Sequence, residues 1–371
     1  MKKLLALILT LILSFNCALV FAAQPSNSLE EDKTARIVIN GAAFKPTNIL
    51  LLKNGSPMLS TDYINALGIT GKNLSWDKSK KKITLIKGTT KLTLELDSSN
   101  YTLNGKKGLI NIKPFTYKGK TYFPAELIAT SFGNKFIPDA DTNTYFIKNN
   151  ADFTNNKKRL GQILTSMNNL TKVKVSEKAE LNLNGNGVKL NNVSSSLTLT
   201  NRLAKVFAAN VKYVTTANGQ LSENNVQMVL YNNKYNVKVD DADWSSLPIS
   251  NEEVALQFDF KGILSNEDLV CAALTETNSS NKNEIILKGN IIMGNSIPVF
   301  LTGQGLLDNN ISQKSIEMTV NKNTNIINSI VLKESGNTLI ANKNFDFSIE
   351  YVIKYSDFNG SFEVVVPKEL K

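Results

Sequence analysis

The chain has 371 residues, with 42 lysines and arginines against 32 aspartates and glutamates, two cysteines and no histidine. The absence of histidine excludes serine and cysteine triads of the usual kind and histidine metal sites, and two cysteines are too few for a cysteine-based zinc site. The net charge of +10 favours anionic partners, but the basic residues are scattered and do not alternate with aromatic residues, so nucleic acid is not an expected partner. We expect a protein that is not an enzyme and holds no metal or cofactor.

Residues 1–23 have the pattern of a secretory signal peptide. Lys2 and Lys3 precede an apolar run from Leu4 to Phe21, and small residues around Ala22 fit a signal peptidase site. A retained membrane anchor is the alternative, because a run of about 18 apolar residues is near the lower limit for crossing a bilayer. Lipid attachment at Cys17 is not expected, because the residues before it do not fit a lipoprotein signal.

Cleavage after the signal would remove two lysines and no acidic residue, which leaves 40 basic and 32 acidic residues and a net charge of +8. Cys271 would then be the single cysteine, so no intramolecular disulfide can form and a sizeable core must stabilise the fold. We expect Cys271 to be buried. No other segment is apolar enough to cross a membrane, so we expect a secreted, extracellular protein associated with the cell wall and its anionic polymers.

Residues 24–34 are polar and predict a flexible lead-in, and residues 35–149 predict a domain of short strands. Turns are expected at Asn40-Gly41 and Asn104-Gly105. Residues 58–68 and 123–133 are weakly similar to each other, which predicts a duplicated β-α-ββ unit. In each copy a glycine, Gly68 or Gly133, is expected to end the helix in the left-handed conformation.

The two copies resemble the copper amine oxidase N-terminal-like domain, a stalk module of secreted Gram-positive proteins, over residues 36–148. The first block runs from Ser56 to Ile86, with Leu59 where the family usually has proline. The second runs from Thr121 to Asp139, with Glu126 in place of the usual arginine and Pro138 in place of tryptophan. The resemblance implies a stalk and not a copper site, and a chain without histidine has no means of amine oxidase chemistry.

Residues 150–158 are polar and predict a linker to a second domain, residues 159–371. Leu160, Ile163 and Met167 recur at helical spacing, and a second helix is expected at 266–275. Alternation of apolar and polar residues predicts a long antiparallel array with strands at 179–183, 197–199, 226–230, 235–239, 285–287, 316–320, 330–332 and 345–355.

Three segments of this second region resemble the LolA-like lipoprotein-carrier half-barrel, including secreted Gram-positive relatives, over residues 157–371. They are Tyr231 to Pro248, Met318 to Thr324 and Tyr355 to Glu369. The expected fold class is therefore α+β, mostly antiparallel β, with a small duplicated stalk domain and a curved half-barrel sheet covered by helices. Such a sheet has an apolar concave face, which its own helices or a hydrophobic guest must cover.

We expect the half-barrel to bind a lipid or another hydrophobic small molecule. The alternatives are a wall-associated structural or interaction module without a small ligand, and a hydrolase that uses two carboxylates. Ordinary core is the alternative for the residues of the predicted lining. Its residues are Leu181, Leu183, Leu197, Leu199, Met228, Leu230, Phe258 and Phe260.

Overall fold

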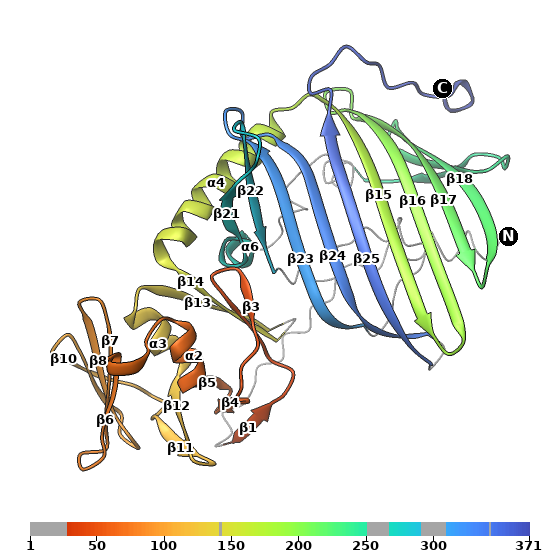
Figure 1. The fold of residues 1–371 in the computed structure, drawn as a ribbon. Coiled ribbons are helices and arrows are strands. Elements are labelled where there is room, and N and C mark those ends of the chain that lie inside the picture. Colours follow the sequence, from red (N-terminus) through yellow and green to blue (C-terminus); the bar gives the residue numbers. More distant parts are fainter. Residues whose placement is uncertain (1–27, 141–142, 251–266, 291–308, 341–342) are drawn as a thin grey trace. The chain divides into compact units, whose positions relative to one another are not determined.

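The computed structural model describes residues 28–140, 143–250, 267–290, 309–340 and 343–371 (Figure 1). The predicted signal peptide lies outside the described residues, as do Phe258 and Phe260. The chain divides into two compact units. The N-terminal unit holds the described residues up to Lys157 together with Asp268–Thr275, and the half-barrel unit holds the described residues of 158–267 and 276–371.

The N-terminal unit is built from short strands. They are β1 (Leu29–Asp32), β2 (Arg36–Ile39), β3 (Ala42–Phe44), β4 (Leu50–Lys53), β5 (Ser56–Ser60), β6 (Leu74–Asp77), β7 (Lys82–Lys87), β8 (Thr90–Glu95), β9 (Asn100–Leu103), β10 (Lys106–Leu109), β11 (Phe115–Tyr117), β12 (Lys120–Pro124), β13 (Asn134–Asp139) and β14 (Thr144–Asn149). Three sheets result among the described residues, in the orders β1-β4-β5-β12-β11, β10-β9-β8-β7-β6 and β13-β14-β2-β3.

Three short helical segments lie between these strands: α2 (Thr61–Ala66), the 3-10 turn η1 (Gly71–Asn73) and α3 (Ala125–Ser131). Tyr63 and Ile64 of α2 and Ile128 of α3 are fully buried in one core. The two predicted glycines, Gly68 and Gly133, follow α2 and α3 with φ values of 83° and 73°, which confirms their left-handed conformation.

Two more helices lie outside these strands, one after β14 and one in the second half of the chain. Helix α4 spans Asn150–Asn168, so the residues predicted as a linker, 150–158, are its first turns. The helix predicted at 266–275 is α6 (Glu267–Ala273), and its Cys271 is buried as expected. No helix among the described residues is long and apolar enough to span a membrane.

The half-barrel unit contains one curled sheet of 11 strands (Figure 1). The strands are β15 (Lys172–Gly185), β16 (Val188–Asn201), β17 (Val206–Ala217), β18 (Gln220–Tyr231), β19 (Lys234–Val239), β20 (Ser245–Pro248), β21 (Thr275–Asn278), β22 (Glu284–Gly289), β23 (Asn309–Asn321), β24 (Ile327–Ile340) and β25 (Lys343–Ser356). Their order is β20-β19-β18-β17-β16-β15-β25-β24-β23-β22-β21, and the pairs from β20 to β22 are antiparallel. The mostly antiparallel α+β class predicted from the sequence is confirmed.

One face of this sheet is buried, and we call it the inner face. From Phe345 onward every second residue of β25 lies on it, and all six are buried: Phe345, Phe347, Ile349, Tyr351, Ile353 and Tyr355. The residues between them, from Asp346 to Lys354, are exposed or half-buried. This period of two is the alternation that predicted the strand.

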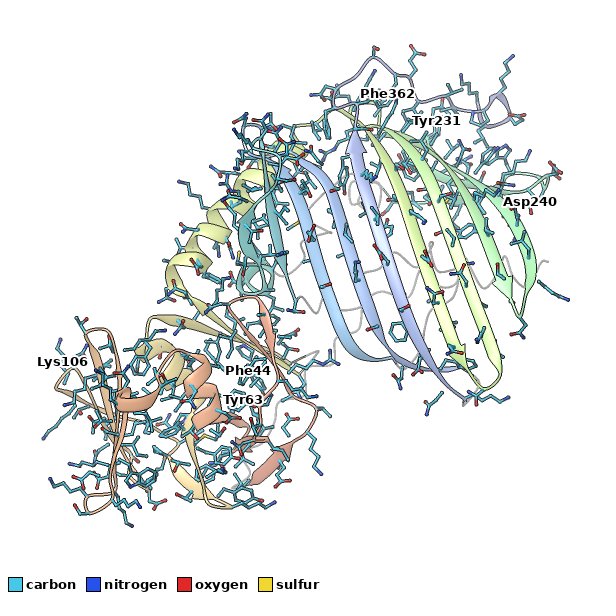
Figure 2. All side chains as sticks on the ribbon, in the orientation of Figure 1. Phe44, Tyr63, Lys106, Tyr231, Asp240 and Phe362 are labelled. Carbon is cyan, nitrogen blue, oxygen red and sulfur yellow. The ribbon has the colours of Figure 1, made fainter. Side chains whose placement is uncertain are left out.

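The last residues of the chain lie against the outer face of the sheet. Val366 packs with Val206 and Val229, whose side chains point away from the inner face. The Asn359 Oδ1 accepts hydrogen bonds from the backbone N–H and the hydroxyl of Thr171, at 2.7 and 2.9 Å. Figure 2 labels Phe362 at this end of the sheet. These contacts fix the C-terminal segment to the start of β15.

Candidate functional site

The inner face carries two apolar clusters that include four of the predicted lining residues. Leu181 and Leu183 of β15 pack with Phe345, Phe347 and Ile349 of β25, and we call this group the β15–β25 cluster. The cluster forms because Leu181 lies opposite Ile349 and Leu183 lies opposite Phe347 in the antiparallel register.

The second group, the β17–β18 cluster, contains Leu230 and Phe207, with Met228 and Tyr235 packed against them. Leu230 lies opposite Phe207 on β17 and opposite Tyr235 on β19. The rings of Phe207 and Tyr235 meet edge to face, with centroids 5.8 Å apart, and the Tyr235 hydroxyl donates to the Met228 sulfur at 3.2 Å.

The structure does not bring Leu197 and Leu199 to this face. In the register of β15 and β16, Leu181 lies opposite Asn192 and Glu177 lies opposite Ser196, so the even-numbered residues of β16 share the inner face. Leu197 therefore points outward, where its exposed fraction is 48%. Alternation alone predicts that a strand has two faces, but it does not say which face turns inward when both carry small or apolar residues.

A polar centre that the sequence analysis missed lies between the two clusters. Glu177 of β15 lies on the inner face, and the Ser196 hydroxyl on β16 donates to its Oε2 at 2.9 Å. The hydroxyl of Tyr351 on β25 also donates to this carboxylate. Tyr351 and Tyr355 lie on either side of Ile353, the residue opposite Glu177, so both tyrosines are its diagonal neighbours.

Two further tyrosines lie close to Glu177. Tyr213 lies opposite Ser194 on β16, one inward pair along from Ser196, and its pKa is raised to about 12 by burial and by the Glu177 charge. Burial also raises the pKa of Tyr235, and the charge of Glu177 adds to that shift. We call Glu177, Ser196, Tyr213, Tyr351 and Tyr355 the Glu177 centre, and Tyr235 lies where the centre meets the β17–β18 cluster.

The centre holds a carboxylate whose charge is not balanced by a lysine or arginine among the described residues. Burial raises the pKa of the Glu177 carboxyl, and the hydrogen bonds from Ser196 and Tyr351 act in the opposite direction without cancelling it. Burial also raises the pKa values of Tyr351 and Tyr355, with the charge of Glu177 as the next cause. Among the described residues no lysine or arginine forms an ion pair with Glu177.

A signal for this centre exists in the sequence. Val173, Ala179, Leu181 and Leu183 share the inward phase of β15, and Glu177 interrupts that phase with a carboxylate. A charged residue at a core position is informative, because glutamate is rarely buried without a partner. The four tyrosines carry no such local signal, since they come from three strands, β17, β19 and β25, and only the sheet brings them close to Glu177.

The centre has no arrangement suited to metal chemistry. Nowhere in the part of the chain that the structure describes do three or more cysteine, aspartate or glutamate side chains gather closely enough to hold a metal ion. A single carboxylate with hydroxyl neighbours can accept hydrogen bonds, bind a cation or exchange a proton.

Comparison with known proteins places a family match on the N-terminal unit. Residues 36–147 match the model of the copper amine oxidase N-terminal domain, which supports the resemblance seen in the sequence. That domain is a non-catalytic stalk. The comparison with curated proteins gave no match.

Several solved structures are similar to parts of the chain at low sequence identity. A DUF1329 family protein from Desulfovibrio piger is 9% identical, with a TM-score of 0.22, over 57% of this chain and 95% of its own. A β-barrel-like protein of the DUF1849 family from Brucella abortus is 10% identical, with a TM-score of 0.19, over 51% and 100%. An S-type phycobiliprotein lyase from Guillardia theta is 5% identical, with a TM-score of 0.16, over 52% and 90%. At these scores the likenesses carry no argument about function, so the family match of residues 36–147 is the one comparison that bears on identity.

Proposed function

We propose that this protein is a secreted, non-enzymatic component of the cell envelope whose half-barrel unit binds a lipid or another hydrophobic small molecule. The observation that carries the proposal is the inner face of the 11-stranded sheet, which presents apolar side chains on strand after strand. Sheets that curl in this way commonly enclose hydrophobic ligands. The resemblance of residues 157–371 to the LolA-like half-barrel points in the same direction.

The apolar surface of the inner face gives a physical reason to expect a ligand. Apolar area contributes about 25 cal/mol per Å² when it is withdrawn from water, so a curled sheet with such a face is stable only when something covers it. Helix α4 supplies part of the cover, because the Met167 sulfur accepts a hydrogen bond from the backbone N–H of Ile327 at the start of β24. At the other end of the strands Leu181, Leu183 and Phe347 are buried in the free chain, with exposed fractions of 5, 7 and 3%, so a ligand chain lying along them would take the place of their present cover.

We assign the N-terminal unit the role of a stalk that presents the half-barrel in the cell wall. The family match of residues 36–147 supports this role. The duplicated β-α-ββ interpretation belongs to the same proposal, and the element order supports it: β5, α2, β6 and β7 in one half and β12, α3, β13 and β14 in the other.

The alternative is a wall-associated structural or interaction module that holds no small ligand. The net charge of +10 favours it, because anionic wall polymers attract a basic protein. Binding to isolated cell walls that weakens steeply with added salt, together with no response to hydrophobic ligands, would favour this module over the carrier.

A matched pair of variants tests the ligand-binding proposal. Leu181→Gln places an amide on the inner face, whereas Leu197→Gln makes the same change on the outer face, where the side chain is 48% exposed. We expect dodecanol to bind the Leu197→Gln variant as it binds the wild type and to bind Leu181→Gln at least tenfold more weakly, measured by calorimetric titration of variants with native circular dichroism. Equal affinity of all three proteins would contradict binding at this face.

A further inference from the structure

The Glu177 centre is a polar part of the otherwise apolar inner face, and the polar end of a bound ligand would lie there. Ser196 and Tyr351 donate to a carboxylate that can accept about four hydrogen bonds, so acceptor sites remain. The same centre lies between the β15–β25 and β17–β18 clusters along the inner face. Such a face matches an amphiphile, because the polar centre can bind the head group while the apolar surface beside it covers the chain.

The charge of the ligand's polar group follows from what surrounds Glu177. No lysine or arginine of the described chain pairs with the half-buried carboxylate, and a charge withdrawn from water without an ion-pair partner is costly. An anionic head group would add a second negative charge at the same place. A cation would instead pair with the carboxylate, for which the described residues supply no ion-pair partner, and would remain within the inner face.

The tyrosines of the centre also favour a positively charged head group. Tyr351 and Tyr355 lie on the two sides of the residue opposite Glu177, and Tyr213 lies on the strand beyond Ser196. Aromatic rings attract ammonium groups through their negative faces, and rings combined with a carboxylate are a recurring way to bind them. Neutral tyrosines with raised pKa values stay protonated beside a cation and a carboxylate.

We infer that the Glu177 centre is a binding site for the ammonium head group of an amphiphilic ligand, whose chain lies on the neighbouring apolar cluster. This inference rests on the proposed function and narrows it to cationic amphiphiles. The Glu177 carboxylate is the ion-pair partner, Ser196 and Tyr351 hold the carboxylate in place, and the rings of Tyr213 and Tyr355 line the head group.

The test uses four ligands with the same chain: dodecylamine, dodecyltrimethylammonium, dodecanol and dodecanoate, each titrated below its micelle concentration into the full chain. Glu177→Gln removes the charge at nearly constant shape. Glu180→Gln is the matched control, because Glu180 is on the same strand with its side chain on the opposite face. We expect the wild type and Glu180→Gln to bind the two ammonium ligands at least tenfold more tightly than dodecanol, and Glu177→Gln to lose that preference while dodecanol affinity stays the same.

The possible outcomes separate this inference from the proposed function. If all four ligands bind with similar affinity, or if the ammonium preference survives in Glu177→Gln, the half-barrel binds hydrophobic molecules but the Glu177 centre does not select their head groups. If none of the ligands binds, the proposed function itself is wrong. A pH titration of the wild type is a second test that needs no variant, because dodecylamine affinity should fall on acidification, with a midpoint above the ordinary glutamate value of 4.5.

Discussion

Glu177 shows how one residue can be unfavourable for folding and still be useful. The inward phase of β15 is otherwise apolar, with Val173, Ala179, Leu181 and Leu183 all buried. The Glu177 carboxylate in that phase is half-buried, and two hydrogen bonds do not compensate fully for the lost hydration, since its pKa remains raised. Sites that cost stability in this way are often binding or catalytic sites.

Replacement of Glu177 by glutamine should therefore change the pH dependence of stability. Because the folded-state pKa is raised, the folded protein binds more protons than the unfolded chain between the two pKa values, and the free energy of unfolding falls as pH rises through that window. We predict that Glu177→Gln is more stable than the wild type at neutral pH and that the difference disappears below about pH 4, in urea unfolding without ligand. A difference that is constant with pH would contradict a raised pKa at this position.

Tyr63 in the N-terminal unit provides a second test at the scale of one residue. Its side chain is fully buried against Phe44, with ring centroids 5.3 Å apart, and its hydroxyl has no hydrogen-bond partner among the described residues. The hydroxyl of Tyr122, by contrast, donates to the Ile49 carbonyl at 3.2 Å. An unpaired buried hydroxyl costs stability, whereas a paired one contributes about 1 kcal/mol.

We predict that Tyr63→Phe leaves the free energy of unfolding unchanged or raises it by up to about 1 kcal/mol. The same substitution at Tyr122 should lower it by about 1 kcal/mol. Urea unfolding of both variants measures the difference. Equal losses at the two positions would mean that the Tyr63 hydroxyl is paired in solution.

At the scale of elements, the position of α6 is the main result that sequence patterns could not give. The apolar residues of 267–273 predicted a helix, but nothing local indicated that Asp268–Thr275 would pack into the N-terminal unit. Two buried donors hold its end: the Lys148 amine donates to the Leu274 carbonyl at 2.5 Å, and the Asn156 amide donates to the Cys271 and Leu274 carbonyls at 2.8 and 2.7 Å. These bonds satisfy carbonyls that a helix C-terminus leaves unpaired.

Gly41 allows this packing to be tested. A Cβ atom there would lie 2.5 Å from the Ala273 carbonyl oxygen and 2.5 Å from the Thr275 Oγ1, and φ is +85°. Gly55 has a similar φ of +75°, but a Cβ would meet nothing within 4 Å.

We predict that Gly55→Ala costs about 1–2 kcal/mol from the left-handed backbone alone, while Gly41→Ala costs clearly more because it also displaces the end of α6. Urea unfolding gives the two costs, and hydrogen exchange of α6 amides locates the effect. Similar losses and unchanged α6 exchange in the two variants would mean that α6 does not pack there in solution.

The strands themselves were predictable, and the reason is physical. A strand with one buried face repeats every two residues, so β25 was visible as Phe345, Phe347 and Ile349 alternating with polar residues. Face assignment failed on β16, because its inward residues Ser194 and Ser196 are small and polar while the outward Leu197 is apolar. The start of α4 was predicted as a linker because its composition is polar, although Phe153 and Asn156 are buried.

At the scale of the whole molecule, the chain consists of two compact units built from different sheets. The N-terminal unit matches the copper amine oxidase N-terminal domain over residues 36–147. The inner face of the half-barrel unit combines apolar clusters with the half-buried carboxylate of Glu177. The sequence predicted two domains, and four of the predicted lining residues, Leu181, Leu183, Met228 and Leu230, lie in the apolar clusters of the inner face. It did not predict the Glu177 centre, because that centre depends on the register of β15 with its neighbours and on the pairing of β15 with β25, which is distant in the sequence.

The most direct test of the central claim is native mass spectrometry of the full chain, secreted by a bacterial host and purified without detergent. The wild type should carry a hydrophobic molecule that organic extraction releases, and Leu181→Gln should carry much less of it than Leu197→Gln. A polypeptide mass without any adduct, combined with a melting temperature that does not respond to added dodecylamine or dodecanol, would contradict ligand binding by the half-barrel.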